Sequence, residues 1–455
     1  KTTLTGNNTY TGNTTISGPS PVSGAVLNVQ SDTALGAASG SIDIESSGVL
    51  ELEGGVSVDK HALNISGART GAGPIRNVSG DNTFTGVVNL GGTTNIGAEA
   101  GSLTLSGGVS GNGVQQNLTI IGSGDTTIGG VSDISILETR GSGTLTLSGT
   151  STVNAGVGII DGEIVLRDGT MTRTAGRDLI GTSGGSGVLT VTGPNATYNA
   201  NDMSIGVNAG GLTTSSRLQV LDGGRLTASR LVAGDGAGAS GAVLVRGAGS
   251  SFSADTLIVG ASADGQLDVL GGASVESDTV FIALGSAGTA NVSGAGSILR
   301  ANTGYSIGAG GAGTLTLSDG GVVQAGDGTG RMNVGQGTFS TLNVGAADGA
   351  AAERAGAFNV GTIEFLANGG ELVLNHTDTD YVLSSNVTGN GTLRQLSGTS
   401  ILTGPNTYTG GTQISGGTLQ VGDGGTGASI AGDIVNNAGL VFDFGDQLDL
   451  DGDIS

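Results

Sequence analysis

The stretch Val243-Leu-Val-Arg-Gly-Ala-Gly-Ser-Ser-Phe-Ser-Ala-Asp-Thr-Leu-Ile-Val-Gly260 contains one structural repeat of this chain in nearly complete form. Apolar residues stand two positions apart at Val243/Val245 and again at Leu257/Val259, and a single Phe252 lies between the two pairs. Such i, i+2 spacing over short runs predicts β-strands that bury one face and expose the other. We therefore expect three short strands in this stretch.

Both pairs recur along the chain with a period of about 25 residues. The first pair returns as Leu189/Val191, Leu218/Val220, Val243/Val245, Leu267/Val269, Ala290/Val292, Leu315/Leu317 and Leu342/Val344. The second returns as Met203/Ile205, Leu231/Ala233, Leu257/Val259, Val280/Ile282, Tyr305/Ile307 and Met332/Val334. The residue between them is Leu226, Phe252, Val275 or Ile298. A fixed internal period of this length is the signature of a repeat architecture.

Three strands per repeat predict an all-β solenoid. One coil cannot bury its inner face alone, so the coils must stack, and each strand then pairs with its copy in the next coil. We expect a single right-handed parallel β-helix, the handedness following the usual crossover chirality. At roughly 25 residues per coil the chain would make about 18 coils, or a rod of about 90 Å. A β-sandwich, the alternative, would instead show hairpin signals every 8 to 12 residues or so.

The domain organisation follows from where the period is clear. We expect one continuous β-helix over 1–455, because no linker or change of composition divides the chain. Within it we distinguish N-terminal coils with irregular loops (1–186), regular coils (187–345), coils with an Ala-rich insertion (346–400) and C-terminal coils (401–455). Changes in repeat spacing should appear as loops at the corners.

The composition agrees with many short strands and tight corners. The chain has 92 glycines in 455 residues and only 5 prolines, and Gly is about 1 kcal/mol worse than Ala inside a helix. Glycines follow nearly every second pair, at Gly206, Gly234, Gly260, Gly308 and Gly335. We expect these glycines to adopt the positive φ that a sharp corner requires.

The charge and the residues that are missing exclude several functions. The formal net charge is -22, which repels phosphate backbones, so nucleic acid is not an expected partner. Cysteine is absent, so there is no thiolate catalysis, disulfide or Cys-based metal site.

Several phrases resemble a known family. They are Thr5-Gly-Asn-Asn-Thr-Tyr-Thr-Gly12, Ser79-Gly-Asp-Asn-Thr-Phe-Thr-Gly86, Thr403-Gly-Pro-Asn-Thr-Tyr-Thr-Gly-Gly-Thr-Gln-Ile-Ser-Gly-Gly-Thr-Leu-Gln-Val-Gly422, Leu27-Asn-Val-Gln-Ser-Asp-Thr-Ala-Leu-Gly36 and Val49-Leu-Glu-Leu-Glu-Gly-Gly55. Together they resemble the passenger-associated transport repeats of bacterial autotransporters, the type V secretion family. The resemblance covers the first ~110 and last ~55 residues and implies an exported β-helix at the surface of a Gram-negative cell. It also implies a partner within the same protein, a C-terminal β-barrel translocator that this chain does not include.

Few residues could carry catalysis, and we expect no enzyme activity, no cofactor and no metal site. His61 and His376 are the two histidines, and we expect both in loops or at the surface. Ser183 stands in a Gly-x-Ser-x-Gly pattern, but that nucleophile motif needs a strand-to-helix turn and a reachable His. Asp255 and Asp278 should stack in neighbouring coils with Asn302 one coil further on. We expect turn capping there; the alternative is an acid/base pair acting on glycans.

Three features are candidates for binding, since function on a rigid scaffold concentrates in loops. The irregular segment Lys60–Asn77 contributes Lys60, His61, Arg69 and Arg76. The densest basic group is Arg217, Arg225, Arg230 and Arg246, which could form a patch on one face of the rod. The Ala-rich stretch Ala346–Ala357 could form a short helix.

The sequence therefore predicts a cell-surface adhesin, and possible virulence factor, that binds a host-cell or extracellular-matrix protein or glycan. The first alternative is self-association, as in a biofilm. The second is an inert stalk that presents an upstream catalytic domain, and a polysaccharide-active β-helix is the enzymatic version.

Overall fold

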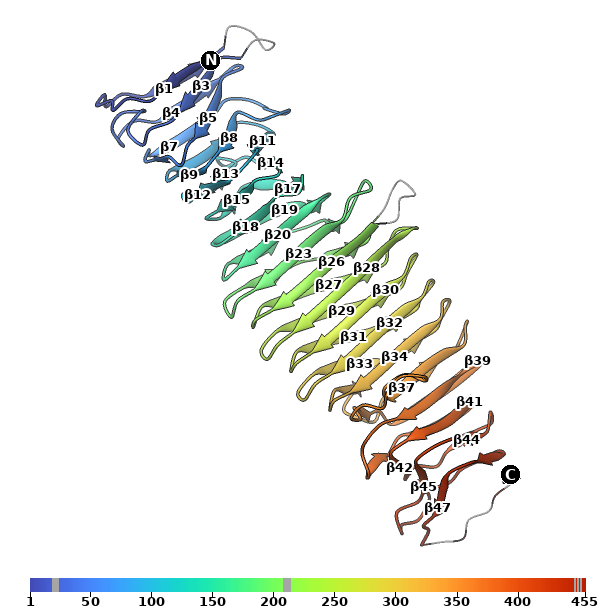
Figure 1. The fold of residues 1–455 in the computed structure, drawn as a ribbon. Coiled ribbons are helices and arrows are strands. Elements are labelled where there is room, and N and C mark those ends of the chain that lie inside the picture. The colour runs from blue at the N-terminus through green and yellow to red at the C-terminus, as the bar shows by residue number, and fades with distance from the viewer. Residues whose placement is uncertain (19–23, 208–213, 446, 448–449, 451) are drawn as a thin grey trace.

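The chain folds into a long parallel β-helix of about 18 turns with roughly 24 residues each. The computed structural model describes residues 1–18, 24–207, 214–445, 447, 450 and 452–455. Figure 1 shows a straight rod with the N-terminus and the C-terminus at opposite ends. Each ladder between strands of the described residues is parallel, so each coil lies on the preceding one. This confirms the predicted fold and its period.

Each coil has three faces, which we call A, B and C in chain order. The strands that belong to face A alone are β1 (Thr2–Leu4), β3 (Val26–Val29), β5 (Val49–Glu53), β8 (Ile75–Ser79), β11 (Thr94–Ala98), β14 (Gln116–Ile121), β17 (Ile134–Arg140), β22 (Arg177–Ile180), β25 (Asp202–Ile205), β36 (Arg331–Val334) and β43 (Thr407–Tyr408).

Face B follows face A in each coil. Its strands are β6 (Ser57–Val58), β9 (Asp81–Phe84), β12 (Ser102–Leu105), β15 (Asp125–Ile128), β18 (Thr144–Leu147), β20 (Gly162–Arg167), β23 (Gly187–Thr192), β26 (Thr214–Leu221), β28 (Ala239–Arg246), β30 (Gly265–Leu270), β32 (Gly288–Ser293), β34 (Gly313–Ser318), β37 (Ser340–Gly345), β44 (Thr412–Ile414) and β46 (Ile434–Asn436).

Face C closes the coil. Its strands are β2 (Thr14–Ser17), β4 (Ile42–Glu45), β7 (Ala62–Ile65), β10 (Val87–Leu90), β13 (Val109–Ser110), β16 (Val131–Ser132), β21 (Thr170–Arg173), β24 (Thr197–Asn199), β35 (Val322–Ala325), β38 (Ala357–Asn359), β40 (Tyr381–Leu383), β42 (Thr399–Leu402), β45 (Thr418–Val421) and β47 (Gly439–Phe442).

Some strands are long enough to bend around a corner. Those that run from face C into face A are β19 (Thr150–Ile159), β27 (Arg225–Ala233), β29 (Ser251–Val259), β31 (Ser274–Ile282) and β33 (Ile298–Ile307). Those that run from face A into face B are β39 (Thr362–Asn375) and β41 (Asn386–Ser397).

The core is one continuous column of inward side chains. On face C of the regular coils the ladder register stacks Leu226 on Phe252, Phe252 on Val275, and Val275 on Leu299. All four side chains are buried. The prediction of Ile298 as the core residue was therefore wrong by one position. The cause is the corner before β33: Leu299 follows Val292 by seven positions, whereas Val275 follows Val269 by six.

The corner glycines behave as predicted. Gly234, for example, has a φ of 76°, and a Cβ there would lie 2.2 Å from the carbonyl oxygen of Ala263 in the next coil. Both the backbone conformation and the close approach of the next coil therefore require glycine. Gly206, Gly260, Gly308 and Gly335 also have positive φ.

Two predictions about loops were wrong. The Ala-rich stretch forms no helix; residues 346–356 are a loop of turns and isolated bridges, and Ala357 begins β38. The segment Lys60–Asn77 is less irregular than expected, because it includes β7 and the start of β8, which leaves 66–74 as the connection. Along the described parts of the chain, no helix is long and apolar enough to cross a membrane.

Candidate binding site

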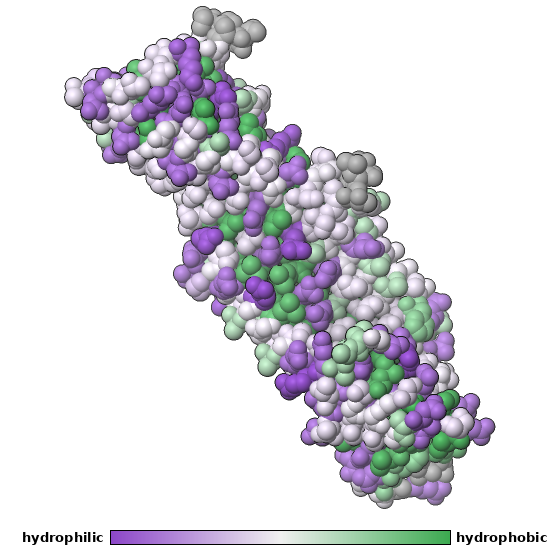
Figure 2. Space-filling view, viewed as in Figure 1, coloured by the Kyte–Doolittle hydropathy of each residue, from purple (hydrophilic) through white to green (hydrophobic). Residues whose placement is uncertain are grey.

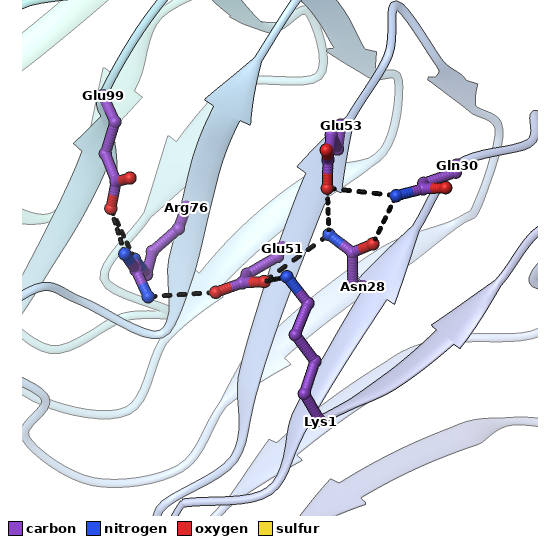
Figure 3. A network of polar contacts seen from close by, with 7 residues as sticks. All are labelled: Lys1, Asn28, Gln30, Glu51, Glu53, Arg76 and Glu99. Atoms are coloured by element: carbon purple, nitrogen blue, oxygen red, sulfur yellow. Dashed lines mark hydrogen bonds and ion pairs between the residues drawn. The ribbon is translucent and has the colours of Figure 1, made fainter.

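The N-terminal candidates Lys60, His61, Arg69 and Arg76 do not form a free binding surface. Arg76 lies on face A between two carboxylates, with Nη1 3.0 Å from Oε1 of Glu51 and the other side of the guanidinium paired with Glu99. Lys1 Nζ lies 2.6 Å from the second Glu51 oxygen. Figure 3 shows how these charges link neighbouring coils. Arg76 is therefore neutralised by partners within the fold.

The same network continues along the outward row of face A. Asn28 Nδ2 donates to Glu53 Oε2 at 3.0 Å, and Gln30 Nε2 donates to the same oxygen at 3.1 Å. These hydrogen bonds lower the pKa of the Glu53 carboxyl. The ladder places Asn28, Glu51 and Arg76 opposite one another in successive coils. The network therefore connects the first coils to one another (Figure 3).

Lys60 and Arg69 are also directed into the fold. Lys60 is only 2% exposed, its ammonium donates to the carbonyl of Ala37, and it lies 5.5 Å from the centroid of the Tyr10 ring. Arg69 donates to the carbonyls of Ser46 and Gly48. Burial lowers the pKa of both cations. Of the four candidates, only His61 has an exposed side chain.

The four central arginines are distributed over all three faces. Arg217 and Arg246 are both on face B, in neighbouring coils. The residue opposite Arg217 in the next coil is Ala242, and Arg246 lies four residues further along that strand. Arg225 begins the face C part of β27, and Arg230 begins its face A part. The structure therefore does not bring these side chains together into one patch.

The expected stack of Asp255, Asp278 and Asn302 is present at the corner between faces C and A. The ladder pairs the residues on either side of Asp255 with those on either side of Asp278. Asn302 Nδ2 donates to Asp278 Oδ1 at 3.1 Å and to Glu276 Oε1 at 3.3 Å. The Asn302 amide therefore binds the carboxylate of the preceding coil.

The catalytic candidates are separated along the rod. Ser183 lies in an exposed corner with a φ of 54°, with no helix after it. His376 directly follows the end of β39 and lies outside the strands, in keeping with the expected loop position, but it is fully buried, so the alternative of a surface position was wrong. Its Nε2 lies 2.8 Å from Ser400 Oγ, its ring packs on Tyr381, and burial lowers its pKa. Within the described ranges, no group of three or more acidic or histidine side chains is arranged to hold a metal ion.

Residues 346–356 form a loop beside face B, which we call the cover loop. Asn375 binds this loop through three hydrogen bonds. Its carbonyl accepts from Ala346 N at 2.9 Å, and its Nδ2 donates to the carbonyls of Ala347 (3.0 Å) and Ala350 (3.1 Å). Asp348 pairs with Arg394 at 2.6 Å, which raises the pKa of that guanidinium. The loop is therefore fixed to the coil that follows it.

The cover loop bounds a cleft of about 530 Å³ on face B, which we call the cover-loop cleft. Its floor consists of outward rows in β30, β32 and β34, which the ladders align as Gln266, Thr289 and Thr314, and as Asp268, Asn291 and Thr316. Ala346, Ala347, Ala350 and Glu353 supply the wall. Small and hydrophilic residues cover most of the face drawn in Figure 2, with hydrophobic residues in local patches.

The cover-loop cleft is acidic. Asp268, Asp319 and Glu353 line it, and no Lys or Arg is among its lining residues. Burial raises the pKa of Asp268, although hydrogen bonding from Gln266 and the charge of Arg217 act in the opposite direction. The sequence identified the cover loop but not the floor of the cleft. The floor residues precede the loop by about 30 to 80 positions in the sequence, and only the register between coils brings them next to it.

A second feature that sequence reasoning missed is a buried ion pair inside the coil. Arg173 Nε lies 2.6 Å from Asp178 Oδ1, and both side chains are almost completely inaccessible. Asp178 also accepts hydrogen bonds from Val157 N at 2.9 Å and from Tyr198 Oη at 2.8 Å. The sequence did contain one indication of this ion pair. Arg173 stands two positions after the buried Met171, where the alternation of the strand predicts an apolar residue.

The chain matches the model of the passenger-associated-transport-repeat at residues 1–18, 137–166 and 397–421. The first and last ranges overlap phrases identified in the sequence, and the middle range was not recognised there.

Two curated proteins resemble parts of the chain. The adhesin BmaC autotransporter of Brucella suis biovar 1 (strain 1330) is 58% identical over 48 residues, which cover 10% of this chain and 1% of that protein. The uncharacterized lipoprotein YdeK of Escherichia coli (strain K12) is 34% identical over 122 residues, 25% of this chain and 9% of that protein. The matched part of the chain thus spans a small fraction of either relative. No solved structure matches the chain.

Proposed function

We propose that this chain, a passenger domain of an autotransporter, is a non-enzymatic adhesion module that acts at the bacterial cell surface. The observation that carries the proposal is the cover-loop cleft, an open cleft lined mainly by polar residues, which a fixed loop bounds on a stack of coils. A binding surface needs such preorganisation, because ordering a flexible loop would cost affinity. The short match to a protein named as an adhesin supports the same function.

The placement of the titratable groups favours binding over catalysis. General acid–base or nucleophilic catalysis requires the reacting groups within hydrogen-bond reach of one substrate. Here His61 is exposed near one end of the rod, and His376 is enclosed in the core near the other. The stacked Asp255 and Asp278 are occupied at a corner, where Asn302 binds the second carboxylate.

The partner we propose is a component of a host-cell surface or of extracellular matrix. The test is saturation binding of the purified chain to mammalian cells, immobilised matrix proteins and a glycan array, with sedimentation velocity of the same sample. We expect saturable binding to at least one surface and a monomer in solution. Turnover of a polysaccharide by the pure chain, or a dimer without binding to any surface, would contradict the proposal.

A further inference from the structure

The chain contains three asparagines that are directly followed by glycine: Asn112, Asn368 and Asn390. Such a pair can lose the side-chain amide, because the backbone nitrogen of the glycine can attack the asparagine Cγ, and glycine has no Cβ to hinder the approach. The three pairs lie in different surroundings, and the differences concern the groups that take part in this reaction.

Asn112 and Gly113 are the two central residues of a tight turn that leads from face C to face A. Their φ angles are 56° and 79°, and Val114 N donates to the carbonyl of Gly111 at 3.1 Å, as in a type I′ turn. Both central residues are exposed, and a Cβ on Gly113 would have no atom within 4 Å apart from its chain neighbours. The turn therefore leaves open space around the nitrogen that would attack.

A carboxylate of the next coil contacts the same nitrogen. Gly113 N–H donates to Asp133 Oδ2 at 3.0 Å, and Asn112 N donates to Ser110 Oγ at 3.0 Å, which fixes the start of the turn. The N–H bond lies in the peptide plane. The nitrogen can therefore approach Asn112 Cγ perpendicular to that plane while the carboxylate holds its proton. Asp133 thus lies within the hydrogen-bond reach that a general base requires.

Asn368 and Asn390 lack this arrangement. Their side-chain amides are held by carbonyls of the preceding coil: Asn368 Nδ2 donates to Gln336 at 2.8 Å, and Asn390 Nδ2 donates to Ala367 at 3.3 Å. The glycine that follows each of them is buried. The Asn112 side chain, in contrast, makes no hydrogen bond within the described part of the chain. Asn112 is therefore the one of the three whose amide is free to react.

We propose that Asn112 is a site of self-catalysed deamidation in the folded protein, with the Gly113 nitrogen as nucleophile and Asp133 as general base. The nitrogen forms a bond to Asn112 Cγ while its proton passes to the Asp133 carboxylate. The Cγ–Nδ2 bond then breaks, and ammonia leaves with that proton, which produces a succinimide ring. Water opens the ring at either carbonyl and leaves aspartate or isoaspartate. Each product adds one negative charge to this corner of the rod, independently of the adhesion function.

The test is peptide mapping by mass spectrometry after prolonged incubation of the folded chain at pH 7.5. We expect amide loss at Asn112, with aspartate and isoaspartate as separable products, at least about ten-fold faster than at Asn368 and Asn390. In guanidinium chloride the three sites should react at similar rates, because each is an asparagine followed by glycine and the folded surroundings are lost.

The variant Asp133→Asn tests the base. Asn tolerates the φ of 54° at this position about as well as Asp does. Its side-chain oxygen can still accept the Gly113 N–H, but it does not take up the proton. We expect the reaction at Asn112 to slow at least about ten-fold. The control Asp161→Asn removes the same charge from an exposed carboxylate that accepts from Ser186 N, and should leave the rate at Asn112 unchanged.

Two results would overturn the inference. One is equal rates at the three asparagines of the folded chain, or a ranking that persists in guanidinium chloride. The other is a rate in Asp133→Asn at or above that of the wild type. The comparison of the three asparagines uses the unchanged chain, so it stands even where a substitution disturbs the turn. Circular dichroism and thermal unfolding of each variant report whether the coils are intact.

Discussion

The N-terminal coils and the regular coils share one architecture but differ in the kinds of side chain that they bury. In residues 187–345 the inward side chains are almost all apolar, and the buried polar residues are mostly serines, with one threonine and one asparagine. In residues 1–186 the buried residues include several that are large and polar or charged, namely Asn28, Glu51, Lys60, Asn77, Asn82, Arg173 and Asp178. Periodic apolar packing thus suffices where the coils repeat, whereas irregular coils use specific polar pairs.

This difference has an energetic consequence. Apolar stacking contributes to the free energy of unfolding in proportion to the area that each side chain buries. Truncating one apolar side chain therefore costs an amount that depends on its size. A buried polar group depends on its partner, and removing the partner leaves a desolvated charge or donor. The N-terminal coils should therefore be more sensitive than the regular coils where a buried charge loses its partner, and less sensitive where only an uncharged amide is removed.

The largest effect is expected for Asp178→Ala. It leaves the Arg173 guanidinium buried without its carboxylate and removes the acceptor of Val157 N and Tyr198 Oη. We expect a loss of about 3 to 5 kcal/mol in local unfolding free energy. Hydrogen exchange of the amides in residues 153–205 measures it.

The control for this prediction is the triple variant Arg173→Met/Asp178→Leu/Tyr198→Phe. It replaces the whole polar group with apolar side chains and should recover most of the lost stability. A loss below 1 kcal/mol in Asp178→Ala would show that the ion pair does not distinguish these coils.

A smaller loss is expected in the regular coils for Leu257→Ala. Leu257 is fully buried between Leu231 and Val280 of the neighbouring coils. Truncation leaves a cavity and should cost about 3 kcal/mol. The exposed Leu284 in the next corner is a matched control, and its change to Ala should cost less than about 0.5 kcal/mol. Equal losses at the two leucines would contradict the account of the core.

Removing a buried, uncharged amide should cost less stability than either Asp178→Ala or Leu257→Ala. Asn82 Oδ1 accepts from Gly55 N (3.0 Å) and Val56 N (2.7 Å), and Asn82→Ala would leave both donors unsatisfied. We expect a loss of about 2 kcal/mol. Asn89→Ala, at a half-buried position on face C, is the control and should change little. Exchange of the Gly55 and Val56 amides gives the most direct reading.

The smallest effect concerns pH in the C-terminal coils, whose buried histidine resembles the polar pairs of the N-terminal coils. Burial holds the pKa of His376 below its ordinary value of 6.5 although Asp378 acts in the opposite direction. The unfolded chain therefore binds the proton first. Stability should be complete above pH 6.5 and fall by about 1 kcal/mol per pH unit as the pH decreases from there toward the lowered pKa.

Hydrogen exchange of residues 372–402 at pH 7.5, 6.5 and 5.5 measures this change. The same experiment with His376→Gln should show a weaker dependence on pH. An unchanged dependence in that variant would assign the effect to other groups.

The sequence predicted the fold because alternation and period report burial directly. Every coil of the regular region needs apolar residues at fixed positions, so Leu257 and Val259 could be placed without coordinates. Ile298 was misplaced because the corner between Val292 and Leu299 is one residue longer than the corner between Val269 and Val275, and the period alone does not reveal this difference.

The site was less predictable, for a physical reason. The residues that line the cover-loop cleft point outward to solvent, where many residue types are tolerated. Their identities therefore do not indicate that they belong to one site. Asp268 and Glu353 become neighbours of one cleft through coil stacking and the hydrogen bonds that Asn375 makes to the cover loop. Lys60 and Arg69 seemed available because the sequence does not show the carbonyls that bind them.

The most direct test of the account is saturation binding of two proteins to the same matrix or cell surface. One is the wild-type chain, and the other has residues 347–354 of the cover loop replaced by a short Gly/Ser linker. Hydrogen exchange should first confirm that the coils of both are equally protected. We predict saturable binding by the wild type and its loss in the loop variant; equal binding by the two proteins would contradict the assignment of adhesion to this cleft.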